Sequence, residues 1–220
     1  VGANVGANKD TEDRTADYVT GIRRLYGLSD YFTVNISSPN TPGLRALQSK
    51  AALEDLIGRV LEARTEKMAE GHRYIPMLVK IAPDLLEADI TDIADLAQKT
   101  DIDGLIVSNT TITRPDTLKS AHKGETGGLS GAPLMSLSTE TLGAMYQATG
   151  GKVPLVGVGG IASGQDAYAK IKAGAALVQL YSMLVYEGPA LVHRVKRELA
   201  ALLKADGFNS VGEAVGVNHR

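Results

Sequence analysis

The segment Tyr31-Phe-Thr-Val-Asn-Ile-Ser-Ser-Pro-Asn-Thr-Pro-Gly43 joins an apolar half to a polar, proline-containing half. Its first half, 31–36, is apolar and rich in strand-forming residues, which is typical of a buried strand. Its second half holds two prolines, which end pairing with a neighbouring strand and keep the backbone extended. A polar turn is the simplest interpretation of that half. Asn35, however, lies inside the apolar run, where a buried amide needs a partner, and a ligand would supply one.

The composition is that of an ordinary globular protein with one sizeable core. The chain has 220 residues, of which 44% are hydrophobic, and a formal net charge of -2. This charge gives no sign of a nucleic-acid partner or of a polybasic membrane surface. The absence of cysteine excludes disulfides, thiolate metal sites and a cysteine nucleophile. No apolar run approaches the roughly 18 residues of a membrane span.

Strand-like apolar runs alternate with helical patterns along the chain. Strands are predicted over 1–6, 31–36, 76–84, 104–111, 153–160 and 176–183. Helices are predicted near 15–26, 53–61, 90–97, around 142, over 163–173 and over 189–204. Ser163 and Asp166 have the spacing of a capping box, and Pro189 suits the first turn of the last helix. The runs are apolar on both faces, which indicates a parallel sheet covered by helices.

Polar side chains gather where each predicted strand ends, and a (β/α)8 barrel carries its active face there. We therefore expect an α/β protein with a (β/α)8 TIM-type barrel fold, with about six of the eight units in a single domain over 1–220. Because six units are two short of eight and the sequence opens on Val1, we expect the first units to precede it. A doubly wound sheet is the alternative. The connection after Thr111 is far longer than an ordinary one and predicts a functional lid or a disordered segment.

A phosphate site is predicted at the last two strands. Gly157-Val-Gly-Gly160 ends one strand without side chains that would block backbone N–H groups, and Tyr181-Ser182 ends the next. Barrels build phosphate sites from their last two units. Tight turns that serve packing alone are the alternative.

Lys80 lies between Val79 and Ile81 in a strand without other charges. A buried lysine needs an anionic partner or a lowered pKa. Lys80 could form a Schiff base, face a ligand that becomes anionic during turnover, or reach solvent at the strand end. The four histidines have no mutual spacing, so we interpret them as surface residues and expect no metal.

Five motifs in register resemble the dihydroorotate dehydrogenases. They are Val34-Asn-Ile-Ser-Ser-Pro-Asn-Thr41, Leu78-Val-Lys-Ile-Ala-Pro-Asp84, Gly104-Leu-Ile-Val-Ser-Asn-Thr-Thr111, Thr126-Gly-Gly-Leu-Ser-Gly131 and Gly157-Val-Gly-Gly160. The first is similar to the family's catalytic segment and the second to its flavin-lysine strand. Class 1 members carry Cys at the base position and class 2 members carry Ser. Ser38 at that position implies a class 2, quinone-linked member.

The resemblance implies FMN-dependent oxidation of (S)-dihydroorotate to orotate in de novo pyrimidine biosynthesis, with electrons passed to a quinone. Ser38 would be the catalytic general base, which takes the C5 proton while hydride leaves C6 for flavin N5. Lys80 would stabilise negative charge on the reduced flavin. FMN would be bound by Asn4, Asn35, Lys80, Ser108, Gly131, Gly160, Tyr181 and Ser182, and dihydroorotate or orotate by Asn35, Asn40, Asn109 and Thr110.

Four further family features are not in this sequence: the flavin loop, the substrate lysine and the Asn-rich substrate segment of two earlier strands, and the N-terminal helices that dock class 2 enzymes on membranes. The sequence thus resembles the C-terminal two-thirds of a class 2 enzyme. Such an enzyme would be peripheral on the inner face of a bacterial cell membrane, or on the mitochondrial inner membrane in a eukaryote, through segments outside this chain. The alternatives are another flavin barrel such as a dihydropyrimidine dehydrogenase domain, a Lys80 Schiff-base aldolase, and a non-catalytic barrel fragment that binds only phosphate.

Overall fold

The computed structural model describes residues 1–39, 44–45 and 49–220. In these ranges one sheet has the strand order β1-β2-β3-β4-β5-β6, and every neighbouring pair is parallel. The predicted parallel sheet is therefore confirmed. The strands are β1 (Gly2–Val5), β2 (Tyr31–Asn35), β3 (Met77–Ile81), β4 (Gly104–Val107), β5 (Leu155–Val158) and β6 (Ala175–Gln179).

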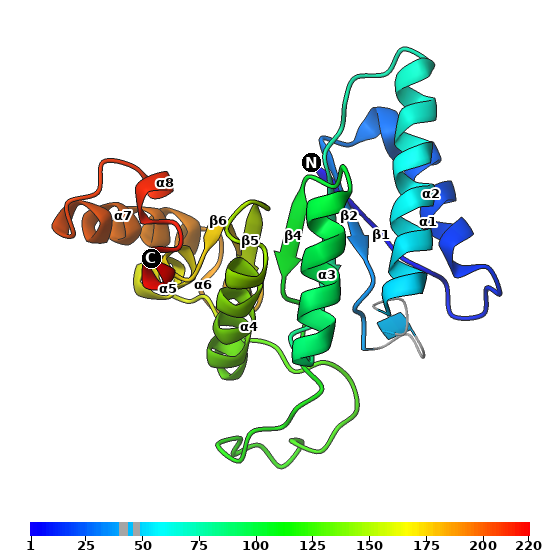
Figure 1. Cartoon of the computed structure of the whole chain (residues 1–220). Helices are drawn as coiled ribbons and strands as arrows, with labels where there is room; N and C mark the ends of the chain where they lie inside the picture. The colour runs from blue at the N-terminus through cyan, green and yellow to red at the C-terminus, as the bar shows by residue number, and fades with distance from the viewer. Residues whose placement is uncertain (40–43, 46–48) are drawn as a thin grey trace.

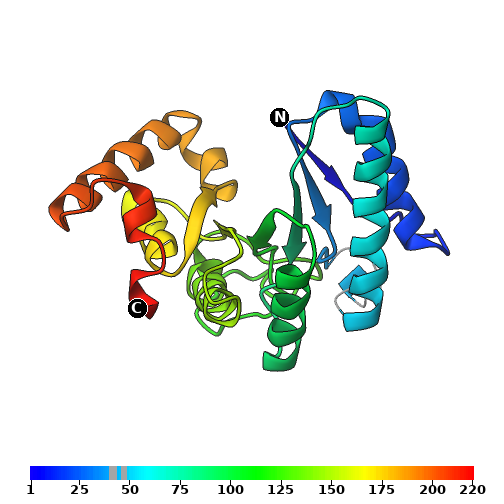
Figure 2. The same cartoon turned by 45° about the horizontal axis from the view of Figure 1, so that its top comes forward.

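Helices connect the strands and cover the sheet on one side (Figure 1). They are α1 (Arg14–Leu25), α2 (Lys50–Ala69), α3 (Glu87–Lys99), α4 (Met135–Ala148), α5 (Gly164–Lys172), α6 (Ser182–Glu187), α7 (Ala190–Ala205) and α8 (Val211–Ala214), with 3-10 turns η1 (Tyr26–Leu28), η3 (Ala132–Leu134) and η4 (Val217–His219). In Figure 2 the strands form an arc and the helices follow its outer side. A doubly wound sheet would reverse its strand order and carry helices on both faces. The sequential order and the one-sided cover instead define part of a (β/α)8 barrel.

The outer face of the arc forms the hydrophobic core. Val34 of β2 and Val79 of β3 are at most 1% exposed and share this core with Leu56 of α2. Because side chains alternate along a strand, Asn35 and Lys80 lie on the opposite, concave face. The sheet thus separates a dry packing face from a face that carries polar groups.

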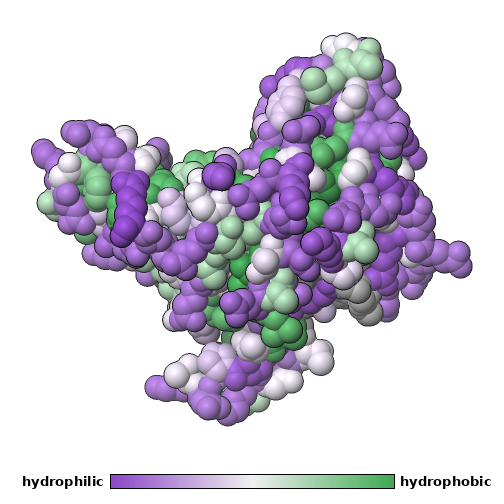
Figure 3. Space-filling model, viewed as in Figure 1, coloured by the Kyte–Doolittle hydropathy of each residue, from purple (hydrophilic) through white to green (hydrophobic). Residues whose placement is uncertain are grey.

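The outward surfaces of the helices are mostly hydrophilic in the view of Figure 3. Over the described residues, no helix combines the length and the apolar composition that a bilayer span requires.

β5 and β6 end earlier than the sequence predicts. β5 stops at Val158 because Gly159 and Gly160 adopt φ angles of 108° and 79°, which no extended strand contains. β6 stops at Gln179, and α6 begins at Ser182. The predicted strand over 176–183 is therefore wrong at its carboxyl end.

The apolar residues after Gln179 pack as a helix instead. Met183 joins a second, smaller hydrophobic cluster with Leu191 and Val195 of α7. Helix α6 was not predicted, since a short apolar run fits a strand end as well as one helical turn.

β1 and β6 have one partner each among the described strands. Leu177 of β6 is 66% exposed, and Asn4 of β1 is exposed as well. Among the described residues, the expectation that both faces of every strand are covered therefore does not hold at these two edge strands.

The predicted helix starts are confirmed with small shifts. Ser163 Oγ accepts a hydrogen bond from Asp166 N at 3.2 Å, and the Asp166 carboxylate accepts one from Ala162 N at 3.0 Å. The capping arrangement is therefore present, with its return bond one residue earlier than in the standard box. Pro189 is the residue that immediately precedes α7.

The long connection between β4 and α4 is an ordered loop. Thr111 and Leu129 form an isolated antiparallel bridge, with N–H to carbonyl distances of 3.1 and 2.8 Å. Arg114 closes the turn further out by donating to the carbonyls of Glu125 at 2.8 Å and Gly127 at 2.7 Å. The interpretation as a disordered segment is excluded, and the bridge fixes both ends of the loop at the carboxyl edge of the sheet.

Candidate functional site

A cavity of about 610 Å³ lies at the carboxyl ends of β3 to β6. This volume is in the range of small-molecule and cofactor sites. Eight of the residues singled out from the sequence line it: Lys80, Ser108, Asn109, Thr110, Gly131, Gly160, Tyr181 and Ser182. The barrel topology explains why these residues line one cavity, since parallel strands bring all their carboxyl ends to one edge of the sheet.

Lys80 is the basic residue in the wall of this cavity. It is in register with Asn35 on one side and with Ile106 on the other. Burial lowers the pKa of its ammonium group, and no carboxylate among the described residues opposes that shift. A buried cation without an acidic neighbour favours an anionic or electron-rich ligand.

An amide cluster stands beside Lys80. Asn35 Oδ1 accepts hydrogen bonds from Ser37 N at 3.3 Å and from Asn109 Nδ2 at 3.2 Å. The Ser37 hydroxyl is fully buried and donates to the Lys80 carbonyl at 2.8 Å. Because its oxygen accepts these hydrogen bonds, the NH₂ group is the part of the Asn35 side chain that remains as a donor.

A backbone turn closes the other end of the cavity. Gly159 and Gly160 have positive φ, and a Cβ at Gly160 would lie 2.5 Å from Met135 Cα. Their N–H groups and that of Ser182 meet no acceptor within the described part of the chain. Successive N–H groups directed at one space form a nest that binds anions such as phosphate.

The loop that ends in Gly131 meets this turn. Gly131 has a φ of 79°, and a Cβ there would approach the Ser182 side chain at 3.7 Å. Ser182 Oγ and Ser130 Oγ are 3.0 Å apart. The hydroxyls of these two serines, on segments more than fifty residues apart, therefore stand next to the unpaired N–H groups.

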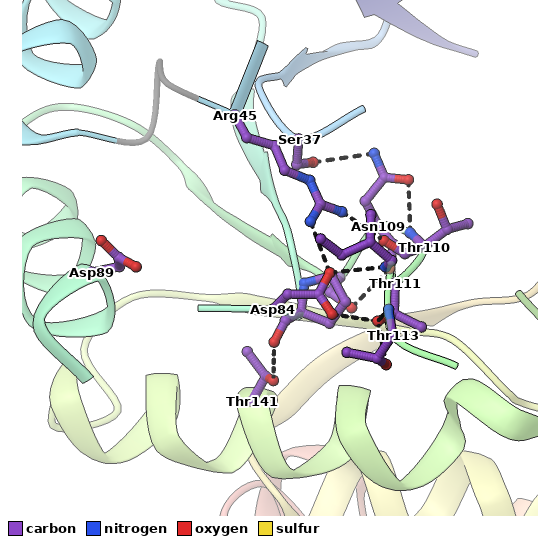
Figure 4. A network of polar contacts seen from close by, with 12 residues as sticks. Ser37, Arg45, Asp84, Asp89, Asn109, Thr110, Thr111, Thr113 and Thr141 are labelled. Carbon is purple, nitrogen blue, oxygen red and sulfur yellow. Dashed lines mark hydrogen bonds and ion pairs between the residues drawn. The ribbon is translucent and has the colours of Figure 1, made fainter. Parts of the chain in front are cut away.

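A network around Asp84 lies behind the amide cluster (Figure 4). The carboxylate accepts from Arg45 Nη1 at 2.8 Å, from Ile112 N at 3.2 Å and from the Thr111 hydroxyl. Arg45 also donates to the Thr110 carbonyl at 3.1 Å. The network joins the loop after β2, the end of β3 and the start of the long connection after β4.

The long connection also returns to cover the site. A Cβ at Gly128 would lie 1.8 Å from Thr110 Oγ1 and 3.0 Å from Pro39. Only glycine allows this close approach between the connection and the loop that follows β2.

Four predicted site residues lie outside the cavity wall or outside the described ranges. Asn4 is exposed on the edge strand β1, in register with Thr33. Asn35 stands behind Asn109, to which it is bonded. Ser38 is half-buried in the loop after β2, and Asn40 lies outside the described residues.

Sequence reasoning missed several polar groups that the fold brings to the site. Ser37 is completely buried. The sequence pattern singled out only its neighbour Ser38. Arg45 and Asp84 are thirty-nine positions apart, and the residue pattern of neither segment predicts that they pair. Lys170 is completely buried in α5. Its position on the same helical face as the apolar residues Ala167 and Ile171 could have predicted this burial.

The fold and the cavity together define a (β/α)-barrel protein with a cofactor-sized site, which lies between a lysine beside an amide cluster and the Gly159–Gly160 turn. A family model described as dihydroorotate dehydrogenase matches residues 1–203. The chain belongs to the dihydroorotate dehydrogenase family.

Relatives from distant organisms match the whole chain. It is 59% identical to a protein named dihydroorotate dehydrogenase (quinone) of Azorhizobium caulinodans, and 54% identical to the mitochondrial protein of that name of Mus musculus. The solved structure of ligand-free type DHODH from Eimeria tenella is 43% identical, with a TM-score of 0.94 over 100% of this chain and 64% of that one. The chain spans 62% and 55% of the lengths of the first two relatives.

Proposed function

We propose that this chain carries the FMN and dihydroorotate sites of a class 2 dihydroorotate dehydrogenase, which oxidises (S)-dihydroorotate to orotate in pyrimidine biosynthesis and passes the electrons to a quinone. The observation that carries the proposal is that Lys80 and the Gly159–Gly160 turn line the same cavity. A flavin needs a phosphate site at one end and a polar, charge-stabilising wall at the other. The residues present fit that requirement.

The family assignment supports a role for each group around the cavity. FMN would be held at its phosphate by Gly160, Tyr181 and Ser182, with Gly131 and Ser108 along its length. Lys80, Asn35 and Asn4 would face the flavin ring, Asn4 from the edge strand. Dihydroorotate or orotate would be bound by Asn35, Asn40, Asn109 and Thr110, whose amides and hydroxyl match the carbonyl, N–H and carboxylate groups of a pyrimidine acid.

Ser38 would act as the general base. It follows a strand whose polar cluster is fixed by Ser37, and the Pro39 ring next to it limits the movement of its backbone. Its hydroxyl would take the C5 proton while passing its own proton on toward solvent, and hydride would leave C6. FMN supplies the hydride acceptor when it is bound.

Lys80 would stabilise the negative charge that develops in the cavity during the reaction. A preorganised cation in a dry site interacts more strongly with such charge than one in water does. Its lowered pKa shows how little the site solvates an ammonium group on its own.

We further propose that residues 1–220 form one flavin-binding barrel domain and that the protein is peripheral on a membrane. The membrane would be the inner face of a bacterial cell membrane or the mitochondrial inner membrane, reached through segments outside this chain. The bacterial and mitochondrial relatives named for quinone support this placement.

The test is spectroscopic. Protein purified with its upstream segment should show a bound-flavin absorption spectrum, and anaerobic dihydroorotate should bleach it. A water-soluble quinone should restore the colour. Protein with no bound flavin, or flavin that dihydroorotate leaves oxidised, would refute the proposal.

A further inference from the structure

Lys170 is a buried cation directly behind the wall of the cavity. It is completely inaccessible to solvent, and its Nζ donates a hydrogen bond of 2.5 Å to Ser138 Oγ. Ser138 is also fully buried. The proposed reaction uses neither residue, and a lysine at such a position needs a reason, because burial of a charged group is costly.

Ser138 connects Lys170 to two residues that line the cavity. Its Oγ lies 2.7 Å from the Leu134 carbonyl and 3.2 Å from the Gly159 carbonyl. A Cβ at Gly159 would approach Ser138 Oγ to 2.8 Å, so the turn packs directly on this hydroxyl. Lys170 itself lies under the strand, since a Cβ at Gly157 would be 3.1 Å from Lys170 Cβ.

The contact between Ser138 and the Gly159 carbonyl is related to the direction of the Gly160 N–H group in the cavity. The Gly159 carbonyl and the Gly160 N–H belong to one planar trans peptide and point in opposite directions. The Gly159 carbonyl oxygen lies 3.2 Å from Ser138 Oγ, on the α4 side, so the N–H of Gly160 is directed away from α4. Gly160 lines the cavity, and its N–H is one of those without an acceptor in the described ranges.

We propose that Lys170 is a positioning residue for a bound phosphate group: through Ser138 it orients the Gly159–Gly160 peptide toward the anion, and its ammonium group adds positive charge behind the turn. The proposal rests on the proposed function, in which the anion is the 5′-phosphate of FMN.

The charge on Lys170 depends on pH near neutrality. Burial lowers the pKa of its ammonium group to about 7, against the opposing effect of the Asp166 carboxylate one turn earlier on α5. α4, β5 and β6 contribute the uncharged residues Ser138, Leu142, Gly157 and Ala175 to this region. On α7, Arg194 and Glu198 pair with each other and with the residues at the start of α5, and Lys80 is the cation of the cavity itself.

Thermodynamic linkage determines whether a higher pH strengthens or weakens the binding of phosphate. A phosphate dianion favours the charged lysine and so raises its pKa, and by reciprocity the protonated protein binds phosphate more tightly. The second ionisation of phosphate, with a pKa near 6, is complete above pH 7.5. FMN affinity should therefore fall as the pH rises from 7.5 to 9, while the affinity for riboflavin, which lacks phosphate, should not follow it.

The experiment compares the two flavins in the full-length protein. Protein loaded with FMN or with riboflavin is diluted at pH 7.5, 8.25 and 9, and the released flavin is measured by its fluorescence. The ratio of FMN to riboflavin affinity should fall about tenfold over this range, within the usual span of site-to-site coupling. Because both flavins share the ring, the ratio cancels effects of pH on Lys80.

Two matched variants test whether Lys170 causes the pH dependence of the affinity ratio. Lys170→Met should lower the ratio at pH 7.5 and abolish its pH dependence, whereas Lys172→Met, which changes a lysine of the same helix that stacks on Tyr168, should leave both unchanged. A flat ratio in the unmodified protein would overturn the role of Lys170 even if Lys170→Met failed to fold. A slope that persists in a folded Lys170→Met protein would overturn it as well. Failure to retain either flavin would instead refute the proposed function.

Discussion

Asn35 and Lys80 are partners in the parallel register of β2 and β3, so their side chains leave the sheet side by side on its concave face. Their chain neighbours Val34 and Val79 are also in register and pack on the helical side. The alternation of apolar and polar residues in two separate strands therefore produces one pair of functional groups. A shift of either strand by one residue would turn the polar group of that strand into the core, which explains why the register is well determined.

We predict that Ser38→Ala lowers the rate of flavin reduction by dihydroorotate by a factor of 10²–10⁴, the usual contribution of a general base. Flavin should stay bound, because the cavity wall does not include Ser38. Ser38→Cys should retain part of the activity, since a thiolate can also accept the proton. Stopped-flow absorbance at neutral pH measures the rate, and a near-normal rate in Ser38→Ala would contradict the assignment.

Lys80→Met should lower the midpoint potential of the bound flavin and slow its reduction. The variant removes a buried cation and keeps most of the aliphatic length, so the packing of the strand should change little. Spectroelectrochemical titration measures the potential. A covalent adduct on Lys80 after borohydride treatment with a carbonyl substrate would instead establish Schiff-base chemistry, and we expect none.

The Arg45–Asp84 ion pair should be a major contribution to stability. Its side chains are only 22% and 11% exposed, and Asp84→Ala would remove the carboxylate that Arg45 Nη1 contacts at 2.8 Å. Loss of one partner of a buried pair costs about 3 kcal/mol. Glu66→Ala breaks the exposed Arg23–Glu66 pair, at 49% and 42% exposure, and should cost less than about 1 kcal/mol. Urea unfolding of both variants measures the difference, and equal losses would contradict it.

The sequence predicted the sheet and much of the cavity wall because both depend on local patterns. Apolar runs, strand-end glycines and the isolated Lys80 are visible in short windows of sequence. The pairing of Arg45 with Asp84 depends on how two loops meet, and no local pattern encodes it. The burial of Lys170 was missed for a related reason, since a lysine on a helix is normally at the surface.

Stability of the flavin-free protein should rise with pH through the action of Lys170. Its pKa is about 7 in the folded state, against an ordinary value of 10.5, so the unfolded state binds more protons between these values. The free energy of unfolding then increases as the pH rises above 7, by at most about 1.4 kcal/mol per pH unit from this group. Urea unfolding from pH 7 to 9 should show a smaller increase in Lys170→Met, and identical slopes would contradict the shift.

The exposed edge strands of the sheet should affect the association and the FMN content of residues 1–220 when they are expressed alone. β1 and β6 each have one strand partner among the described residues, and Leu177 of β6 is 66% exposed. Unpaired apolar strand edges pair with other chains, so residues 1–220 expressed alone should associate and retain little FMN. Adding roughly 100 upstream residues, the shortfall from a whole barrel of about 250 residues plus a membrane-docking arm, should restore monodisperse, yellow protein.

Leu177→Lys offers a control for the association of the fragment, since a charge at an edge discourages pairing. In residues 1–220 it should reduce the association seen by light scattering without increasing the FMN content, because Leu177 does not line the cavity. Both measurements are made at the same protein concentration, since association depends on it. A monomeric 1–220 protein with stoichiometric FMN would show that the six strands are sufficient for the site.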